Sequence, residues 1–136
     1  MKAAQVYAEL STAVRLQVGC VIVKDNTIIG IGYNGMPSGW DNVCEEIKHT
    51  DFTGTVLMKS KPEVLHAETN AIAKVSRSNN STDSADLFVT HAPCLECAKL
   101  IYQSGIKSVF YRDTYRSDEG INFLQKCNGE VKQIGQ

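Results

Sequence analysis

Hydrophobic and polar positions alternate in two segments near the start of the chain. Val18–Lys24 and Thr27–Tyr33 are rich in β-branched residues, and Asp25-Asn26 between them is typical of a tight turn. This pattern predicts a β-hairpin. Before the hairpin, apolar residues at helical spacing predict a short amphipathic helix over Ala3–Leu16.

The segment Asn34–Pro62 is Gly-rich, polar and poorly periodic, and a short helical turn within it is compatible with the pattern. A loop of this length inside a small domain is uncommon, and such loops tend to carry function. We therefore expect this segment to contribute to a binding or catalytic site.

After Glu63 the chain alternates between helical and strand-like patterns, with a polar surface loop over Ser76–Ser84. A hairpin followed by such an alternation predicts an α/β fold, with a mixed sheet and helices on its faces, in one domain over residues 1–136. The predicted elements are helices over Val64–Val75, Leu95–Ser104 and Glu119–Lys126, and strands over Asp86–Thr90, Lys107–Tyr111 and Glu130–Ile134.

Composition narrows the class of protein. The chain has 136 residues, 43% of them hydrophobic, which is enough for one well-formed core. Its formal net charge is −1, from 14 basic and 15 acidic residues, whereas proteins that grip nucleic acid usually carry a basic excess. We see neither a secretory signal nor an apolar run near the roughly 20 residues that span a bilayer. We expect a soluble, cytoplasmic protein with no nucleic-acid or membrane partner.

The cysteine pattern is not that of a disulfide framework, because the count is odd and the spacing irregular. The cysteines are Cys20, Cys44, Cys94, Cys97 and Cys127.

Two fragments indicate metal chemistry: His66-Ala67-Glu68 and Pro93-Cys94-Leu95-Glu96-Cys97, with Cys94 28 positions after His66. A C-x-x-C pair alone is a weak signal, since redox motifs and structural zinc sites share it. Combined with an upstream H-x-E it matches the known signature H-x-E…P-C-x-x-C of zinc-dependent nucleobase deaminases.

The physical chemistry of zinc suits these residue types. One imidazole (His66) and two thiolates (Cys94 and Cys97) leave the fourth tetrahedral position of zinc open for water. Both fragments fall where a helix is predicted to begin, and the positive end of a helix favours thiolate over thiol. Pro93 suits the first turn, where its missing N–H is not needed.

Glu68 distinguishes a catalytic site from a structural one. Zinc lowers the pKa of bound water, and a nearby carboxylate that is not itself a ligand can take the proton and pass it to the substrate. We therefore expect Glu68 to be a proton shuttle and not a zinc ligand.

Simpler interpretations stay open for several of these residues. The two cysteines could belong to a closed structural zinc site or a redox pair, and Glu68 could be an ordinary first-turn acid. Cys44 and His49 could form a second metal site, although no convincing further ligands are present. His91 is interpreted as lining or bracing the pocket. Cys20 and Cys127 are interpreted as small buried apolar residues.

Five blocks of the chain resemble the deoxycytidylate deaminase family of the cytidine deaminase superfamily. The block Gly32–Gly39, which reads G-Y-N-G-M-P-S-G, is the most particular to the branch that acts on deoxycytidylate (dCMP). The remaining blocks are Val18–Val23, His66–Ile72, Ala92–Ile101 and Ser104–Lys107.

This resemblance implies a three-layer α/β/α fold with a five-stranded mixed sheet, and zinc-dependent hydrolysis of dCMP to dUMP and ammonia, which feeds dTMP synthesis. It also implies that Asn34 contacts the deoxyribose or base, and that Ala67 and Pro93 lie against the substrate. Arg15 and Tyr115 are the candidates for the phosphate, since an Arg fork and a Tyr hydroxyl can both hydrogen-bond it. A solvated cation at the helix end is the alternative for Arg15, and Arg116 competes with Tyr115.

The resemblance further implies a homohexamer that is activated by dCTP and inhibited by dTTP with Mg²⁺. Turn geometry is the alternative for each candidate effector residue taken alone. These candidates are Lys24, Gly35, Met36, Ser38, Gly39, Trp40, Asp41 and Arg77.

One departure concerns Pro62–Leu65, which lacks the extra cysteine that some relatives carry before the histidine. This argues against a second structural zinc ion.

Other functions remain as alternatives. The chain could be a different zinc deaminase, acting on cytidine, cytosine, guanine or adenosine in tRNA, or an inactive nucleotide-binding relative. A DNA-competence or redox accessory protein has no positive feature in the sequence.

Overall fold

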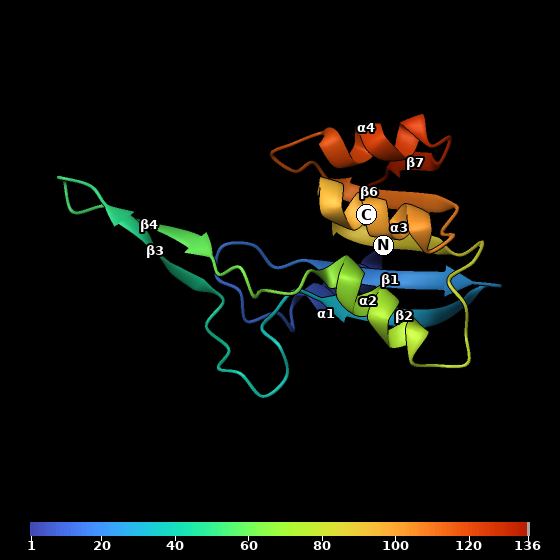
Figure 1. Ribbon diagram of the computed structural model, residues 1–136, viewed down its shortest axis with the longest axis horizontal. Coiled ribbons are helices and arrows are strands. Elements are labelled where there is room, and N and C mark those ends of the chain that lie inside the picture. The colour runs from blue at the N-terminus through green and yellow to red at the C-terminus, as the bar shows by residue number, and fades with distance from the viewer. Residues whose placement is uncertain (136) are drawn as a thin grey trace.

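The computed structural model describes residues 1–135, and its centre is a five-stranded sheet in the order β2-β1-β5-β6-β7 (Figure 1). β1 runs antiparallel to both β2 and β5, whereas β5, β6 and β7 are mutually parallel. The predicted mixed sheet is therefore confirmed. Its strands are β1 (Gly19–Lys24), β2 (Thr27–Tyr33), β5 (Asp86–His91), β6 (Ser108–Asp113) and β7 (Glu130–Gln133).

Helices cover both faces of this sheet, which confirms the predicted three layers. α1 (Lys2–Ala8) lies on one face, and α2 (Ala67–Ser76), α3 (Leu95–Gln103) and α4 (Glu119–Lys126) lie on the other (Figure 1). The apolar core between the sheet and α2 and α3 includes fully buried Ile22, Leu87, Val75 and Ile101.

Gly32 brings α2 close to the sheet. A Cβ at this position of β2 would overlap the carbonyl oxygen of Ala67 and lie 2.6 Å from the backbone nitrogen of Ala71. The absence of a side chain therefore fixes the distance of α2, the helix that begins beside His66 and carries Glu68, from the sheet.

The N-terminal helix is shorter than predicted, because it ends at Ala8 and not at Leu16. The following segment is irregular and is held by side-chain contacts to distant parts of the chain. The Ser11 hydroxyl donates to the carbonyl of Asn34 (2.8 Å), and the Thr12 hydroxyl donates to the carbonyl of Asn42 (3.0 Å). These bonds compete with continuation of the helix.

The long loop predicted after Tyr33 contains a second, two-stranded antiparallel sheet, whereas the sequence pattern suggests at most a short helical turn there. β3 (Glu45–Thr50) and β4 (Val56–Ser60) form a hairpin that projects from the body (Figure 1), and we call Glu45–Ser60 the arm. At its tip the Asp51 carboxylate accepts hydrogen bonds from the backbone N–H groups of Thr53 and Thr55, both at 2.9 Å. The arm forms through pairing between its two strands and through this turn, and no hydrophobic periodicity in the sequence indicates it.

Most other boundaries differ from the predictions by only one or two residues. The exception is α2, which begins at Ala67 and not at Val64, because Leu65 pairs with Gly35 in an isolated β-bridge. Cys20 is fully buried as predicted, whereas Cys127 is partly exposed, which corrects its interpretation as a buried residue. No helix within residues 1–135 is long and apolar enough to cross a membrane.

Candidate active site

The N-termini of two helices place a cluster of metal-binding side chains. His66 is the N-cap of α2, Cys94 is the N-cap of α3, and Cys97 lies in the first turn of α3. The Nδ1 atom of His66 lies 3.2 Å from Sγ of Cys97 and 3.6 Å from Sγ of Cys94. The three ligand atoms all lie within 4.8 Å of one another, as the motif spacing predicts.

These separations fit a tetrahedral zinc ion. With Zn–N near 2.0–2.1 Å and Zn–S near 2.3 Å, a nitrogen and a sulfur ligand lie about 3.6 Å apart. Among the residues that the structure describes, no other group of three possible ligands comes together. Cys44 instead lies buried 3.6 Å from the Thr12 hydroxyl while His49 is exposed on the arm, so the alternative of a second metal site there has no support.

The electrostatics of the two thiols also favour a cation. Hydrogen bonds from Cys97 and His66 lower the pKa of Cys94 to about 3, so that Cys94 is a thiolate. The neighbouring thiolate and burial raise the pKa of Cys97 above its ordinary value. A divalent cation between the two sulfurs would offset the repulsion between two thiolates and so favour ionisation of Cys97 as well.

Glu68 lies two residues beyond His66, in the first turn of α2, and is only 5% exposed. Burial raises the pKa of its carboxyl group, although its own backbone N–H and His66 act in the opposite direction. A buried carboxyl group with a raised pKa beside a cavity is suited to accept and return a proton near neutral pH.

A cavity of about 670 Å³ opens beside this cluster, within the usual range for small-molecule sites. Four of the five predicted substrate contacts line it, whereas Pro93 is fully buried and is not among the lining residues. The lining residues are Arg15, Leu16, Val18, Asn34, Ser60, Lys61, Pro62, Val64, His66, Ala67, Glu68, His91, Ala92, Cys94, Asp113, Thr114, Tyr115 and Arg116.

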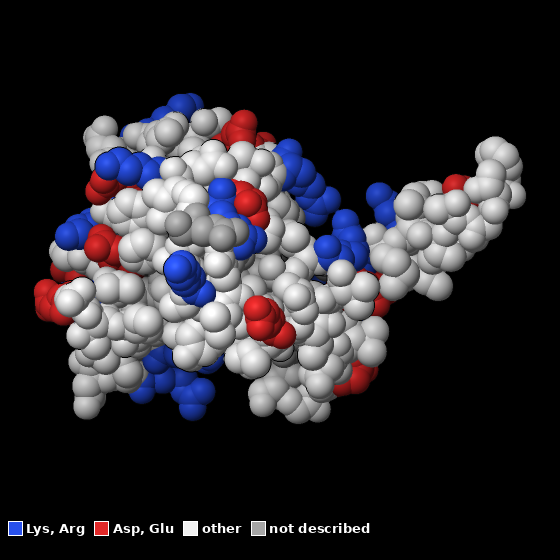
Figure 2. Space-filling view, turned by 180° about the vertical axis from the view of Figure 1, so that it is seen from behind, with Lys and Arg blue, Asp and Glu red and all other residues white. Residues whose placement is uncertain are grey.

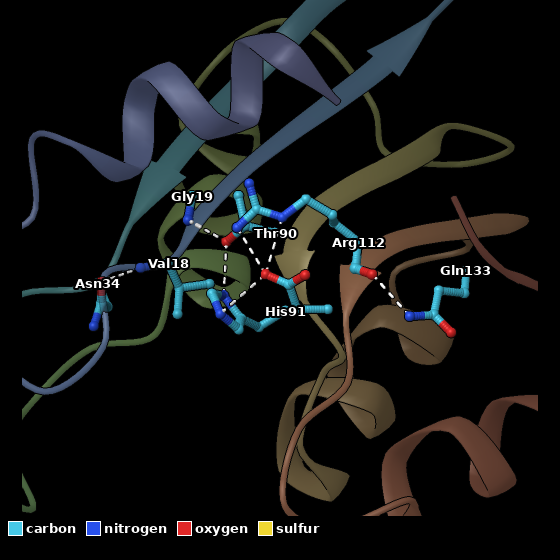
Figure 3. Close-up of polar contacts among 8 residues, drawn as sticks. Val18, Gly19, Asn34, Thr90, His91, Arg112 and Gln133 are labelled. Carbon is cyan, nitrogen blue, oxygen red and sulfur yellow. Dashed lines mark hydrogen bonds and ion pairs between the residues drawn. The ribbon is translucent and has the colours of Figure 1, made fainter. Parts of the chain in front are cut away.

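Asn34 uses its side chain to hold the cavity wall. Its Oδ1 atom accepts a hydrogen bond from the backbone N–H of Val18 at 2.8 Å (Figure 3). Its Nδ2 atom donates to the carbonyl of Leu16, also at 2.8 Å. One N–H and one lone pair remain for a ligand. The same residue can therefore brace the wall and contact a substrate.

His91 lines the cavity, as predicted, within a polar chain on the floor of the site (Figure 3). The N–H of Gly19 donates to the Thr90 hydroxyl (3.1 Å), which lies 3.0 Å from Nδ1 of His91. Nε2 of His91 lies 3.6 Å from Oδ2 of Asp113. Because the Thr90 hydroxyl accepts from Gly19, it is free to donate to Nδ1, which favours the tautomer with the proton on Nε2.

The protonation states of His91 and Asp113 follow from their surroundings. Burial lowers the pKa of His91, while Asp113 opposes this effect. The Arg112 guanidinium donates to Oδ2 of Asp113 at 2.9 and 2.7 Å and holds the pKa of that carboxyl group below its ordinary value. Near neutral pH the floor therefore presents a neutral imidazole and an ionised, paired carboxylate.

Three basic side chains line the cavity: Arg15, Lys61 and Arg116. Arg15 is a predicted phosphate contact, and Arg116, the alternative to Tyr115, donates to the Tyr115 hydroxyl at 3.1 Å and also lines the cavity. Lys61 was missed because it lies in the aperiodic segment, where no pattern distinguishes it from a surface lysine. From behind, basic side chains are visible where the arm joins the body (Figure 2).

The candidate effector residues do not line the cavity and do not form one group within the chain. Lys24 pairs with Thr27 at the turn of the β1–β2 hairpin, whereas Gly35–Asp41 follow Tyr33 at the opposite end of β2. Arg77 caps the C-terminus of α2, which lies toward the turn because Val75 packs against Gly30. Within one chain, Lys24 and Gly35–Asp41 therefore lie at opposite ends of the β1–β2 hairpin, and their role as effector residues stays a prediction.

Comparison with known proteins places both sequence motifs in a family of zinc-binding deaminases. The family model described as cytidine and deoxycytidylate deaminase zinc-binding region matches residues 1–113, which include both motifs. The chain belongs to this family.

Members of the family with established names are similar over much of the chain. ComE operon protein 2 of Bacillus subtilis is 39% identical over 108 residues, covering 79% of this chain and 53% of that protein. Human deoxycytidylate deaminase is 41% identical over 131 residues, covering 88% of this chain and 66% of that protein. The chain thus spans about half to two thirds of the length of these curated relatives.

A solved family structure matches over almost the whole chain. The dCMP deaminase from the cyanophage S-TIM5, crystallised in complex with dCMP and dUMP, has a TM-score of 0.86 and is 40% identical. The match covers 98% of this chain and 92% of that chain. The fold is therefore the cytidine-deaminase-like fold.

Proposed function

We propose that this family member hydrolyses dCMP to dUMP and ammonia. The observation that carries the proposal is the joint placement of His66, Cys94, Cys97 and buried Glu68 beside a cavity with Arg15 on its wall. Similarity to named deoxycytidylate deaminases and to the cyanophage dCMP deaminase supports the choice of substrate.

In this proposal His66, Cys94 and Cys97 hold one zinc ion per chain. When bound, zinc would lower the pKa of a water molecule and so supply the nucleophile. Glu68 takes one proton from the attacking water and delivers it to the ring nitrogen next to the amino-bearing carbon, while the remaining hydroxyl bonds to that carbon. It then takes the proton of this hydroxyl group and passes it to the amino group, whose C–N bond breaks to release ammonia and leave the uracil carbonyl. Burial of Glu68 keeps bulk water from exchanging these protons.

The remaining residues of the cavity bind and orient the nucleotide. Arg15 and Tyr115 contact the phosphate, and Lys61 and Arg116, which line the same cavity, add positive charge. Asn34, with one free N–H, contacts the deoxyribose or base, and the backbone of Ala67 lies against the pyrimidine.

Steady-state deamination of dCMP, deoxycytidine and CMP at equal zinc loading tests the substrate. We expect kcat/KM for dCMP to exceed that for deoxycytidine by at least about 100-fold, because the phosphate contributes charge-assisted hydrogen bonds. A preference for the free nucleoside would overturn the substrate and favour a nucleoside deaminase. Turnover of none of the three with zinc present would favour an inactive nucleotide-binding relative.

Regulation and assembly form a separate part of the proposal: a cytoplasmic homohexamer activated by dCTP and inhibited by dTTP with Mg²⁺. The position of Gly35–Asp41 outside the cavity is compatible with an effector site distinct from the catalytic one. Titration of dCMP with and without each dNTP, together with sedimentation, tests this part. Hyperbolic kinetics unaffected by dNTPs would remove regulation and leave the chemistry intact.

A further inference from the structure

The cavity wall that carries Arg15 is irregular and is poorly anchored by packing. After α1 ends at Ala8 the chain has no regular structure until Gly19. Val14, the residue before Arg15, is 87% exposed, so burial of apolar surface does little to fix this part of the wall. Hydrogen bonds must therefore determine where Arg15 begins its path into the cavity.

Asn34 holds Leu16 and Val18 on one side of Arg15, and Glu45, at the base of the arm, supplies the bonds to Val14 and Arg15 themselves. One carboxylate oxygen, Oε1, accepts hydrogen bonds from two consecutive backbone N–H groups, those of Val14 (2.8 Å) and Arg15 (3.1 Å). Glu45 is only 5% exposed and, within residues 1–135, makes no ion pair.

Two consecutive N–H groups directed at one anion fix the local backbone more strictly than one bond would, since both peptide planes must face the same point. A buried carboxylate is also costly to leave without partners, which opposes movement of Val14 and Arg15 away from it. The direction of the Arg15 Cα–Cβ bond is thereby set by a side chain far away in the sequence.

The same strand rung shapes another part of the cavity wall. Glu45 is paired with Ser60, and the N–H of Lys61 donates to the carbonyl of Cys44 at 2.8 Å. Ser60 and Lys61 both line the cavity. The base of the arm therefore places one cation through its backbone and a second one through the Glu45 side chain.

We propose that Glu45 is a positioning residue that confers selectivity for a phosphorylated substrate by holding Arg15 toward the phosphate. This inference rests on the proposed function. It assigns Glu45 no contact with the substrate or with the reacting atoms, since Glu45 does not line the cavity. A structural role alone would affect substrates with and without a phosphate equally, whereas the proposed role affects only the former.

The test compares Glu45→Ala with Glu46→Ala in the full chain loaded with zinc. Glu46 is the matched control, because it is the neighbouring carboxylate on β3, pairs with Lys59 along the arm at 3.3 Å and is not among the residues that line the cavity. We expect Glu45→Ala to lower kcat/KM for dCMP about tenfold, mainly through KM, because small misplacement of a binding group is costly. The value for deoxycytidine should change less than about twofold, and Glu45→Gln, whose amide oxygen still accepts both N–H groups, should largely restore dCMP turnover.

Binding supplies a readout that does not depend on turnover. By calorimetry, Glu45→Ala should weaken dUMP about tenfold and leave deoxyuridine unchanged, and combining it with Arg15→Ala should add little further loss. If Glu45→Ala does not fold, Glu45→Asp, which keeps the charge but withdraws the oxygen by one bond length, provides the same comparison.

Equal losses for both substrates, or additive effects with Arg15→Ala, would overturn the positioning role while leaving the proposed function in place. A wild-type protein that treats dCMP and deoxycytidine alike would overturn the proposed function itself, and the inference with it.

Discussion

Replacement of Glu68 by Gln is the perturbation that most directly tests the chemistry. The amide has nearly the same shape as the carboxyl group but cannot accept and release a proton. The ring protonation and the departure of ammonia should therefore both fail, while the zinc ligands His66, Cys94 and Cys97 keep their places.

The structure indicates a large effect. A positioned acid–base group usually contributes about 10²–10⁴-fold to the rate. Bulk water cannot easily substitute, because Glu68 is 5% exposed. Asp113, the other carboxylate on the cavity, is held ionised by Arg112 at 2.7 Å. We expect kcat to fall about 10³–10⁴-fold, which corresponds to about 4–5.5 kcal/mol in the activation free energy.

The assay follows the absorbance change as the cytosine ring becomes uracil, with zinc content measured on the same samples. Glu96→Gln is the matched control: Glu96 is also a first-turn carboxylate, on α3, but its side chain is 79% exposed and pairs with Lys99. We expect the control to stay within about twofold of wild type. A Glu68→Gln protein with full zinc content and kcat within tenfold of wild type would refute the proton-shuttle role.

Three further predictions follow from the same site. Cys94→Ser should lose bound zinc and activity, whereas the control Cys127→Ser should retain about one zinc ion per chain, as measured by elemental analysis. Zinc retained in Cys94→Ser would contradict the ligand set. Gly32→Ala should lower the free energy of unfolding by about 1–3 kcal/mol in urea titrations and weaken zinc binding, because its Cβ would overlap the α2 backbone. Gly35→Ala, with nothing within 4 Å of its Cβ, should change little, and equal effects would be inconsistent with this reasoning. The His91 imidazole should titrate below its ordinary pKa of 6.5 in an NMR titration, because burial disfavours its charged form. The unfolded state then binds this proton first, so the contribution of His91 to stability is lost as the pH falls through 6.5 toward the lower folded pKa; an NMR midpoint above 6.5 would contradict this sign.

Local chemistry explains which features could be predicted from sequence. The strands and helices of the body are defined by periodicity over a few residues, and His66 and Cys94 stand at helix starts that the sequence marks clearly. Spacing within each motif and the α/β alternation were therefore sufficient to predict the metal-binding cluster and the mixed sheet.

Features that depend on contacts distant in sequence were missed. Glu45 acts on Arg15 across 30 positions, and no periodicity connects them. Lys61 reaches the cavity only because the arm folds back on itself, and Pro93 follows the correct motif yet is buried.

The arm can unfold locally without the body of the protein. Among the described elements, β3 and β4 pack closely only on each other, and Ile47, Leu57 and Phe52 are exposed along them. A two-stranded hairpin in water is marginally stable, so unzipping can start at Phe52 and advance along the ladder while the central sheet stays intact. The first pair whose opening would reach the cavity is Glu45 with Ser60. Its loss would release Ser60 from the cavity lining and the Glu45 carboxylate from the backbone N–H groups of Val14 and Arg15, whereas opening of the outer part of the arm would leave both in place.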